Sequence, residues 1–269
     1  MEYFIKTNSG VPLFVNDINP EGHHAILFIH GWPANYKAFE YQYNELGKLG
    51  YRLIGVDTRG FGNSGKPWSG YDYNTLADDL RCIIDSLGLH NITLLGHSTG
   101  GAIAIRYMSR HNGCGIGKLV LAASAAPSLV KRPDFPYGLD VSVVTDIIKN
   151  AYEDRPKMLT DFGKIFFYSK ISQPFSEFFF NLGLEAASWS TIAIAQTWLA
   201  EVLFNDMKAV HVPTLIMHGI HDQVVPYELG IIQNRGIAGS RMATFEQSGH
   251  GLFYDEKDKF NKVLSEFAR

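Results

Sequence analysis

Short apolar runs alternate with longer amphipathic stretches along the first half of the chain, and this alternation limits the folds that the sequence can adopt. The apolar runs, which have the length and composition of strands covered on both faces, lie at 25–29, 52–56, 92–95 and 119–123. The amphipathic stretches between them, which have helical spacing, lie at 35–48, 74–87 and 102–110. Such an alternation predicts an α/β fold with a doubly wound, mostly parallel sheet. The segments 3–6 and 12–15 predict a β-hairpin ahead of it.

The alternation breaks off between about 127 and 206. This part has no strand-like run, is dense in aromatic residues, and is divided by prolines at 133, 136, 156 and 174. The strand–helix pattern then resumes with a strand at 214–217, a helix at 227–234, a strand at 242–245 and a C-terminal helix from Asp255. We therefore expect a core formed by residues 1–126 and 207–269, with residues 127–206 inserted between two of its strands as a helical cap.

Charge and composition exclude several classes of protein. The net charge of −3, without a long basic run, argues against a nucleic-acid-binding surface. Two cysteines, Cys82 and Cys114, cannot form a disulfide framework. The N-terminus lacks the features of a secretory signal, and the apolar stretch 178–203 is broken by Asn181 and two glutamates, which favours cap helices over a membrane span. We expect a soluble, cytoplasmic protein that binds neither nucleic acid nor membrane; its oligomeric state stays open.

The strongest chemical signal is a serine between two glycines. Residues 96–100 read Gly-His-Ser-Thr-Gly, after the strand at 92–95 and before a helix. A tight turn between a strand and a helix is where a nucleophilic serine is held with its hydroxyl exposed, and glycines let the two backbone segments approach closely. This context predicts that Ser98 is a nucleophile.

A serine hydroxyl needs an adjacent base, and the base needs a carboxylate that orients it. Among the ten histidines, His250 follows the last strand in a segment of small residues that leaves room for the imidazole. Asp222 follows the strand at 214–217, whereas Asp206 precedes that strand and residues 122–126 contain no carboxylate. The chain order serine, acid, histidine agrees with a catalytic triad of Ser98, Asp222 and His250.

Acyl transfer also requires backbone N–H groups that stabilise a developing oxyanion. We expect these from Trp32, in the loop after the strand at 25–29, and from Thr99, directly after the nucleophile; Pro33 has no N–H. His30, His97 and His218 are interpreted as structural: His30 as a tie between its loop and backbone carbonyls, the other two as neighbours of the strand ends.

Two other kinds of site are disfavoured. The glycine-rich segment 57–65 lacks the spacing of a phosphate-binding loop. Five histidines follow strands, yet none shows the spacing of a zinc-binding helix and no thiolate pair accompanies them. We expect neither a metal nor a cofactor.

Several segments together resemble the α/β-hydrolase superfamily, over nearly the whole chain outside the cap. They are 30–33 (His-Gly-Trp-Pro), 57–60 (Asp-Thr-Arg-Gly) with Gly62 and Ser64, 71–73 (Tyr-Asp-Tyr), 96–101 (Gly-His-Ser-Thr-Gly-Gly) and 248–250 (Ser-Gly-His). Within the superfamily they are similar to small bacterial carboxylesterases and arylesterases grouped with cofactor-free haloperoxidases. The resemblance implies the α/β-hydrolase fold and the same five site residues.

One position departs from that group. The group commonly has methionine after the nucleophile, where this chain has Thr99. The expected oxyanion donor is a backbone group and is preserved, but the side chain that lines the pocket changes, which leaves the substrate and any peroxide-dependent activity open. Dehalogenases and epoxide hydrolases of the superfamily have aspartate at the position of Ser98, which argues against both.

The resulting hypothesis is a serine hydrolase that cleaves carboxylic esters of small to medium, fairly apolar substrates through an acyl-enzyme. Hydrolysis of a C–C bond, an amide or a thioester with the same triad remains open. So do lyase or cofactor-free oxygenase chemistry and a non-catalytic ligand receptor, because a fold alone does not decide between them.

Overall fold

A computed structural model describes residues 1–269 and contains one eight-stranded sheet in the order β1-β2-β4-β3-β5-β6-β7-β8. The pairs β1–β2 and β2–β4 are antiparallel, and all later pairs are parallel. The strands are β1 (Glu2–Lys6), β2 (Pro12–Ile18), β3 (Ala25–Ile29), β4 (Arg52–Val56), β5 (Ile92–His97), β6 (Ile116–Ala122), β7 (Thr214–Gly219) and β8 (Arg241–Phe245). The predicted doubly wound, mostly parallel sheet is confirmed.

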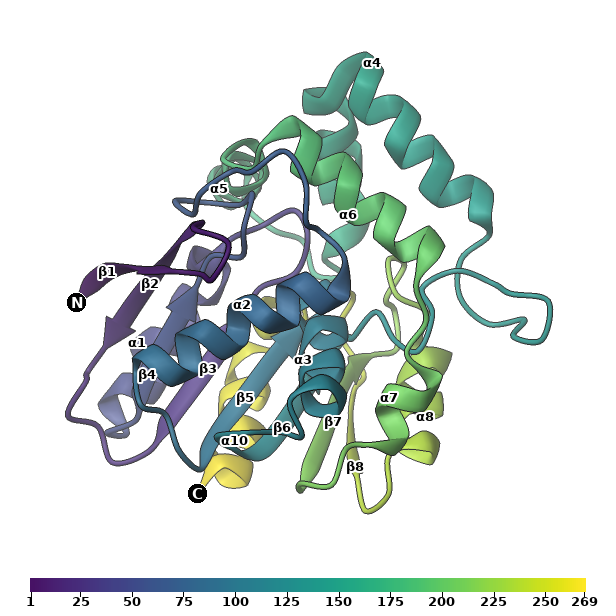
Figure 1. The fold of residues 1–269 in the computed structure, drawn as a ribbon. Coiled ribbons are helices and arrows are strands. Elements are labelled where there is room, and N and C mark those ends of the chain that lie inside the picture. Colours follow the sequence, from purple (N-terminus) through teal and green to yellow (C-terminus); the bar gives the residue numbers. More distant parts are fainter.

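Helices cover both faces of the sheet, with α1 and α10 on one face and α2, α3, α7 and α8 on the other (Figure 1). Their bounds are η1 (Tyr36–Phe39), α1 (Glu40–Lys48), α2 (Tyr73–Ser86), α3 (Thr99–Arg110), α7 (Phe204–Lys208), α8 (Tyr227–Gly236), α9 (Leu252–Asp255) and α10 (Lys257–Ala268). Because both faces are covered, every residue of the central strands β5 and β7 is buried.

Several predicted boundaries differ from the structure, and the following bear on the site or on the C-terminal helix. The strand predicted at 92–95 continues to His97, and the helix predicted from 102 begins at Thr99, so Ser98 alone forms the turn. Gly100 and Gly101 both belong to the first turn of α3. The C-terminal helix predicted from Asp255 begins at Lys257, because the chain departs from helical geometry at Glu256 (φ −123°, ψ 52°) after the short helix α9.

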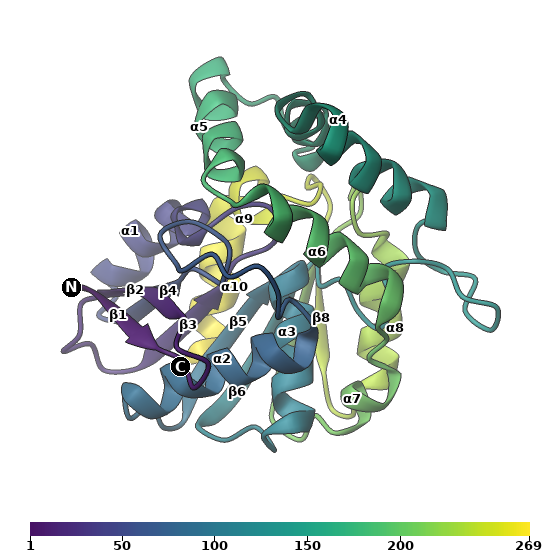
Figure 2. The same ribbon diagram turned by 45° about the horizontal axis from the view of Figure 1, so that its top comes forward.

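The inserted segment between β6 and β7 contains three helices that lie across the carboxyl ends of the strands (Figures 1 and 2). They are α4 (Val141–Phe166), α5 (Gln173–Leu184) and α6 (Ser188–Ala200). Pro156 lies inside α4, where the backbone of Asp154 is non-helical and kinks the helix, and Pro174 stands in the first turn of α5. The Leu203 N–H donates to the carbonyl of Pro127 (2.8 Å), which joins the two ends of the insertion.

No single helix of the protein is long and apolar enough to cross a membrane. Only the pair α5 and α6 reaches that length and composition, and the two helices are bent by 87° relative to each other.

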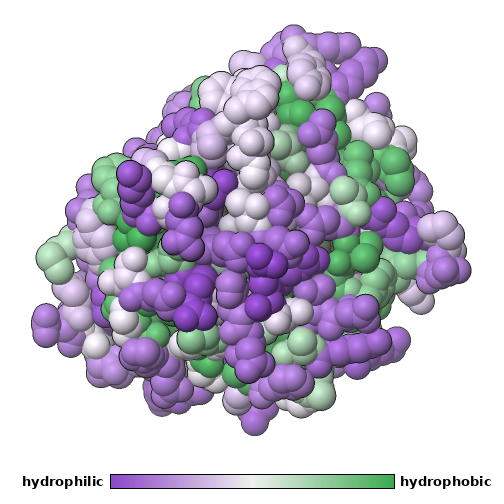
Figure 3. Space-filling model, in the orientation of Figure 1, coloured by the Kyte–Doolittle hydropathy of each residue, from purple (hydrophilic) through white to green (hydrophobic).

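The molecular surface is uneven in polarity. Hydrophilic side chains cover the middle of the face shown in Figure 3, over α2, and hydrophobic ones gather nearer the cap. An open groove of about 420 Å³ includes Trp68, which is 80% exposed, and Tyr152 and Trp189 of α4 and α6. None of its lining residues lies at a strand end, so this groove is separate from Ser98.

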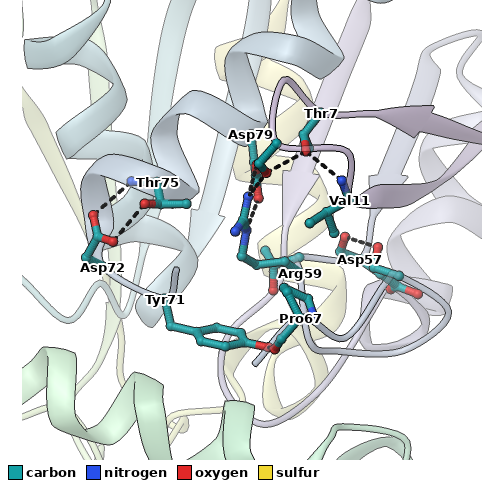
Figure 4. Close-up of polar contacts among 12 residues, drawn as sticks. Thr7, Val11, Asp57, Arg59, Pro67, Tyr71, Asp72, Thr75 and Asp79 are labelled. Atoms are coloured by element: carbon teal, nitrogen blue, oxygen red, sulfur yellow. Dashed lines mark hydrogen bonds and ion pairs between the residues drawn. The ribbon is translucent and has the colours of Figure 1, made fainter. Parts of the chain in front are cut away.

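A buried ion pair fixes the loop that follows β4 to helix α2 (Figure 4). Arg59 binds Asp79 with two hydrogen bonds, from Nε to Oδ2 (2.5 Å) and from Nη2 to Oδ1 (2.6 Å). The two residues are 3% and 6% exposed. Burial raises the pKa of Asp79, although Arg59 opposes that rise. A carboxylate in this position therefore depends on its arginine.

We expect Arg59→Met to lower the free energy of unfolding by about 3–5 kcal/mol at neutral pH, because it leaves the Asp79 carboxylate buried without a counter-charge. Loss of the arginine raises the pKa of Asp79 further. A carboxyl group whose pKa is higher in the folded than in the unfolded state destabilises the folded state increasingly as the pH rises from the unfolded-state pKa through the folded-state pKa. The deficit should therefore be smaller in acidic than in neutral buffer. Urea unfolding measures both, and the double variant Arg59→Met/Asp79→Leu should recover most of the loss. Equal stability of the single and double variants would contradict the prediction.

Candidate active site

Ser98 occupies a strained turn between β5 and α3. Its backbone has φ 54° and ψ −121°, and a positive φ is unfavourable for any residue with a side chain. Strain of this kind costs about 1–3 kcal/mol and persists only where the surroundings enforce it. Ser98 is 5% exposed. The predicted position of Ser98 between a strand and a helix is confirmed.

Glycines enforce this turn because no side chain fits between the segments that meet there. A Cβ on Gly96 would lie 2.4 Å from the carbonyl oxygen of Gly100, and a Cβ on Gly100 would lie 2.4 Å from the carbonyl oxygen of Ile29. A Cβ on Gly31, in the loop after β3, would lie 2.8 Å from Ser98 Cβ. The start of α3 is thus pressed against β5 and against the end of β3.

Asp222 and His250 form a buried pair beside this turn. Asp222 follows β7, His250 follows β8, and His250 Nδ1 lies 2.8 Å from Asp222 Oδ2. The other carboxylate oxygen, Oδ1, accepts the backbone N–H groups of Val224 and Val225, each at 2.8 Å. His250 Nε2 is buried and has no hydrogen-bond partner. The structure contains no hydrogen bond between Ser98 Oγ and His250 Nε2, so it brings two of the three predicted residues into direct contact.

Charge and hydrogen bonds keep Asp222 ionised. Burial alone would raise the pKa of this carboxyl group, but attraction to His250 and hydrogen bonds from His218 and His250 outweigh burial and hold the pKa well below its usual range. An ionised carboxylate beside Nδ1 holds the imidazole with Nδ1 protonated, which leaves Nε2 as the free acceptor.

His218, the fifth residue of β7, is a second histidine in contact with this carboxylate. Its Nε2–H donates to the carbonyl of Val225 (2.9 Å) and lies 3.3 Å from Asp222 Oδ2. Its Nδ1 is buried without a partner. The sequence placed His218 at a strand end, as the structure has it, but gave no sign of this contact.

His97 and His30 also act as neutral donors. His97 Nε2–H donates to the carbonyl of His250 (3.0 Å). This bond joins the residue before Ser98 to the loop after β8 that carries His250. Burial lowers the pKa of His97 well below its ordinary value and that of His30 to about 4. His30 Nδ1 bonds the Gly31 carbonyl (2.9 Å), and its Nε2 accepts the N–H of Thr58 (3.0 Å). The predicted tie between His30 and a backbone carbonyl is confirmed.

The two N–H groups predicted to stabilise an oxyanion belong to segments that meet at Ser98. Thr99 is the first residue of α3, where a helix leaves its N–H groups without intrahelical acceptors. Trp32 lies in the loop after β3, next to Gly31. Neither backbone N–H donates to another group of the protein. Both are therefore free to donate to a ligand.

The cap places an aromatic layer over these residues. Trp32 packs edge-to-face against Phe162 of α4 (ring centroids 4.9 Å apart) and Trp198 of α6 (5.1 Å). Phe166, at the end of α4, packs edge-to-face against His250 (4.9 Å). The region around Ser98 is thus walled mostly by apolar side chains.

Asp255 joins the end of α4 to the loop after β8 that carries His250. Its carboxylate accepts the N–H groups of Tyr168 (2.9 Å), Ser169 (3.0 Å) and Gly249 (2.9 Å). The Gly251 N–H donates to the carbonyl of Phe166 (2.9 Å).

No group of three or more His, Cys, Asp or Glu side chains is arranged to hold a metal ion.

Comparison with known proteins agrees with this geometry. A model of the alpha/beta hydrolase fold family matches residues 24–141. The AB hydrolase superfamily protein YisY of Bacillus subtilis is 48% identical over 269 residues, which cover 100% of this chain and 99% of that protein. The chain belongs to the α/β-hydrolase superfamily.

Two solved structures of this superfamily are close to it. An esterase from Exiguobacterium antarcticum superimposes with a TM-score of 0.97 at 43% identity, covering 100% of this chain and 99% of the other. A bromoperoxidase from Bacillus anthracis superimposes with a TM-score of 0.94 at 32% identity, covering 99% of each chain. This α/β hydrolase is thus related to esterases and cofactor-free haloperoxidases, as the sequence motifs indicated.

The close approach at Gly100 gives a stability test with an internal control. Gly100→Ala should lower the free energy of unfolding by about 1–3 kcal/mol, because the new methyl group meets backbone oxygens that cannot move aside. Gly163→Ala, in α4, places the same methyl group where no atom lies within 4 Å, and should leave stability unchanged or raise it by up to about 1 kcal/mol. Urea unfolding of both variants decides; similar stabilities would mean that the start of α3 can shift away from β3.

Proposed function

We propose that this α/β hydrolase cleaves carboxylic esters of small to medium, fairly apolar substrates through an acyl-enzyme on Ser98. The observation that carries the proposal is the buried Asp222–His250 pair, whose free Nε2 has no partner within the protein, beside a serine held in a strained turn. A buried base without a partner is costly unless it serves a reaction. The likeness to an esterase from Exiguobacterium antarcticum over the whole chain supports the same reaction class.

In the proposed acylation step, Ser98 Oγ attacks the carbonyl carbon of the ester while His250 Nε2 takes the hydroxyl proton. The hydroxyl turns toward Nε2 for this transfer, since no hydrogen bond joins them in the unliganded protein; such contacts commonly tighten only when substrate is bound. Asp222 stabilises the resulting imidazolium, and the N–H groups of Trp32 and Thr99 stabilise the oxyanion.

The tetrahedral intermediate then collapses. Its C–O bond to the alcohol breaks, and His250 gives the proton to the leaving oxygen. For deacylation, a water molecule attacks the acyl carbon as His250 takes its proton, and the carboxylic acid leaves as the proton returns to Ser98.

The same triad could act on amides, thioesters or C–C bonds, and the scaffold could serve a lyase, a cofactor-free oxygenase or a ligand receptor. Esters are favoured because the aromatic layer over Ser98 offers no charged group to a substrate and because the esterase relative matches throughout. A covalent serine adduct separates the hydrolases from a lyase or a receptor.

The nucleophile is tested by labelling and turnover together. Ser98→Ala should keep the fold, lose p-nitrophenyl ester hydrolysis down to a residual rate of roughly 10³–10⁴ over water, and no longer take up a serine-directed phosphonate. The control is Ser124→Ala, since Ser124 follows the neighbouring strand β6 and has a buried hydroxyl without a partner. That variant should be labelled and active like the wild type. Labelling of Ser98→Ala, shown by intact-protein mass, would assign the nucleophile elsewhere.

The aromatic layer sets an expected chain-length profile. Each methylene that fits an apolar pocket contributes about 0.8 kcal/mol, roughly fourfold in kcat/KM, until the pocket is full. Activity on straight-chain esters should rise from acetate to about butyrate or hexanoate and then fall, because the aromatic rings that bound the pocket pack on one another. Trp32 packs against Phe162 and Trp198, and Phe162 packs against Phe166. Measuring kcat/KM from acetate to palmitate checks this. A maximum at palmitate, or a preference for charged acyl groups, would contradict an apolar pocket of this size.

A further inference from the structure

Trp32 and Thr99, the two residues expected to supply backbone N–H groups to the oxyanion, are held by their side chains to the same cap helix. The indole N–H of Trp198, on α6, donates to Thr99 Oγ1 (3.1 Å). The indole N–H of Trp32 donates to the carbonyl of Thr191, also on α6 (3.1 Å). All four residues are buried, so water does not compete for either bond.

Helix α6 is itself fixed to the core at several points. The N–H of Ala187, just before the helix, and the hydroxyl of Ser190 both donate to the carbonyl of Gly60 (2.9 and 2.8 Å). Thr197 Oγ1 donates to the carbonyl of Tyr71 (3.0 Å). A helix held in this way can serve as a rigid spacer between the loop of Trp32 and the start of α3.

The two indole rings also support each other. The rings of Trp32 and Trp198 pack edge-to-face, with centroids 5.1 Å apart and planes at 80°. A shift of either ring would therefore disturb the other as well as its own hydrogen bond. The loop after β3 and the first turn of α3 are thus coupled through side chains of the cap, in addition to the backbone contact at Gly31 and Gly100.

We propose that Trp198 is a positioning residue that, through Thr99 and Trp32, sets the spacing of the two N–H groups that bind the oxyanion. The inference rests on the proposed ester hydrolysis. It assigns to the cap a part in catalysis itself, beyond shaping the pocket for the acyl group. It also gives a role to the hydroxyl of Thr99, which a methionine at this position could not fill because methionine offers only a weak sulfur acceptor.

The oxyanion develops in the transition state and the tetrahedral intermediate and is absent from the bound ester, so a change in N–H spacing lowers kcat and leaves KM nearly unchanged. Loss of a whole oxyanion donor reduces kcat by about 10²–10³. Displacement of a donor that remains present should cost less, roughly tenfold. A residue that only lines the pocket would instead change KM and the chain-length preference.

The experiment compares kcat and KM on p-nitrophenyl acetate, whose acyl group is too short to fill an apolar pocket. The variants are Trp198→Phe, which removes the indole donor; Thr99→Val, which removes the acceptor at nearly constant shape; their double variant; and Thr99→Ser, which restores an acceptor. The matched control is Trp189→Phe on the same helix, whose indole N–H donates to the carbonyl of Pro67 (2.8 Å), outside the site. Thermal unfolding confirms that each variant is folded.

We expect each single variant to lower kcat roughly tenfold with KM within about twofold, and the double variant to be no worse than the more severe single one. Thr99→Ser should recover most of the kcat that Thr99→Val loses, and Trp189→Phe should stay near the wild type. A double variant whose losses multiply, or a Trp198→Phe variant altered only in KM, would overturn the inference. Should Trp198→Phe fail to fold, Thr99→Val against Thr99→Ser still decides. A wild type that hydrolyses no ester overturns the proposed function, and this inference with it.

Discussion

The close approach of α3 to β5 and β3 is the constraint on which the rest of the site depends. Ser98 holds a positive φ because the helix must begin one residue after the strand ends, and it can begin there only because Gly96 and Gly100 carry no side chain. The same contact places the first N–H groups of α3 beside the loop that carries Trp32. Strain at one residue is thus the geometric condition for bringing a hydroxyl and two backbone donors to one point.

The site contains one ionised carboxylate, Asp222, among several buried histidines. His30, His97 and His218 are buried, and each uses a ring N–H to bind a backbone carbonyl. Burial lowers the pKa of His30 and of His97, so neither ring adds a positive charge beside the Asp222–His250 pair. These histidines thus orient loops through hydrogen bonds, and burial of His30 and His97 adds no further charge near Asp222 and His250.

The sequence could predict which residues follow a strand, but not which side chains of different segments come into contact. Ser98, Asp222 and His250 could be found because each follows a strand, and the carboxyl ends of parallel strands meet at one edge of a sheet. The contact of His218 with Asp222, the bond from Trp198 to Thr99 and the ties of Asp255 to the cap could not. The last two depend on how the inserted segment is oriented, and the first depends on how the chain turns after β7. No local pattern specifies either. The helix predicted from 102 begins earlier, at Thr99, because glycines inside a helix look like turn residues.

The hydrogen bond between Leu203 and Pro127 has a consequence for the history of such proteins. Because the chain leaves the sheet and returns to it at the same place, a segment of almost any length can be accommodated there, and the entropic cost of closing a longer loop grows only slowly. Exchange of this segment during evolution therefore changes the free energy of folding little. Exchange of this segment does affect the candidate site, since it removes the hydrogen bond from Trp198 to Thr99. A related protein can therefore keep the sheet and its strand-end residues and still lose the contact between the cap and the start of α3.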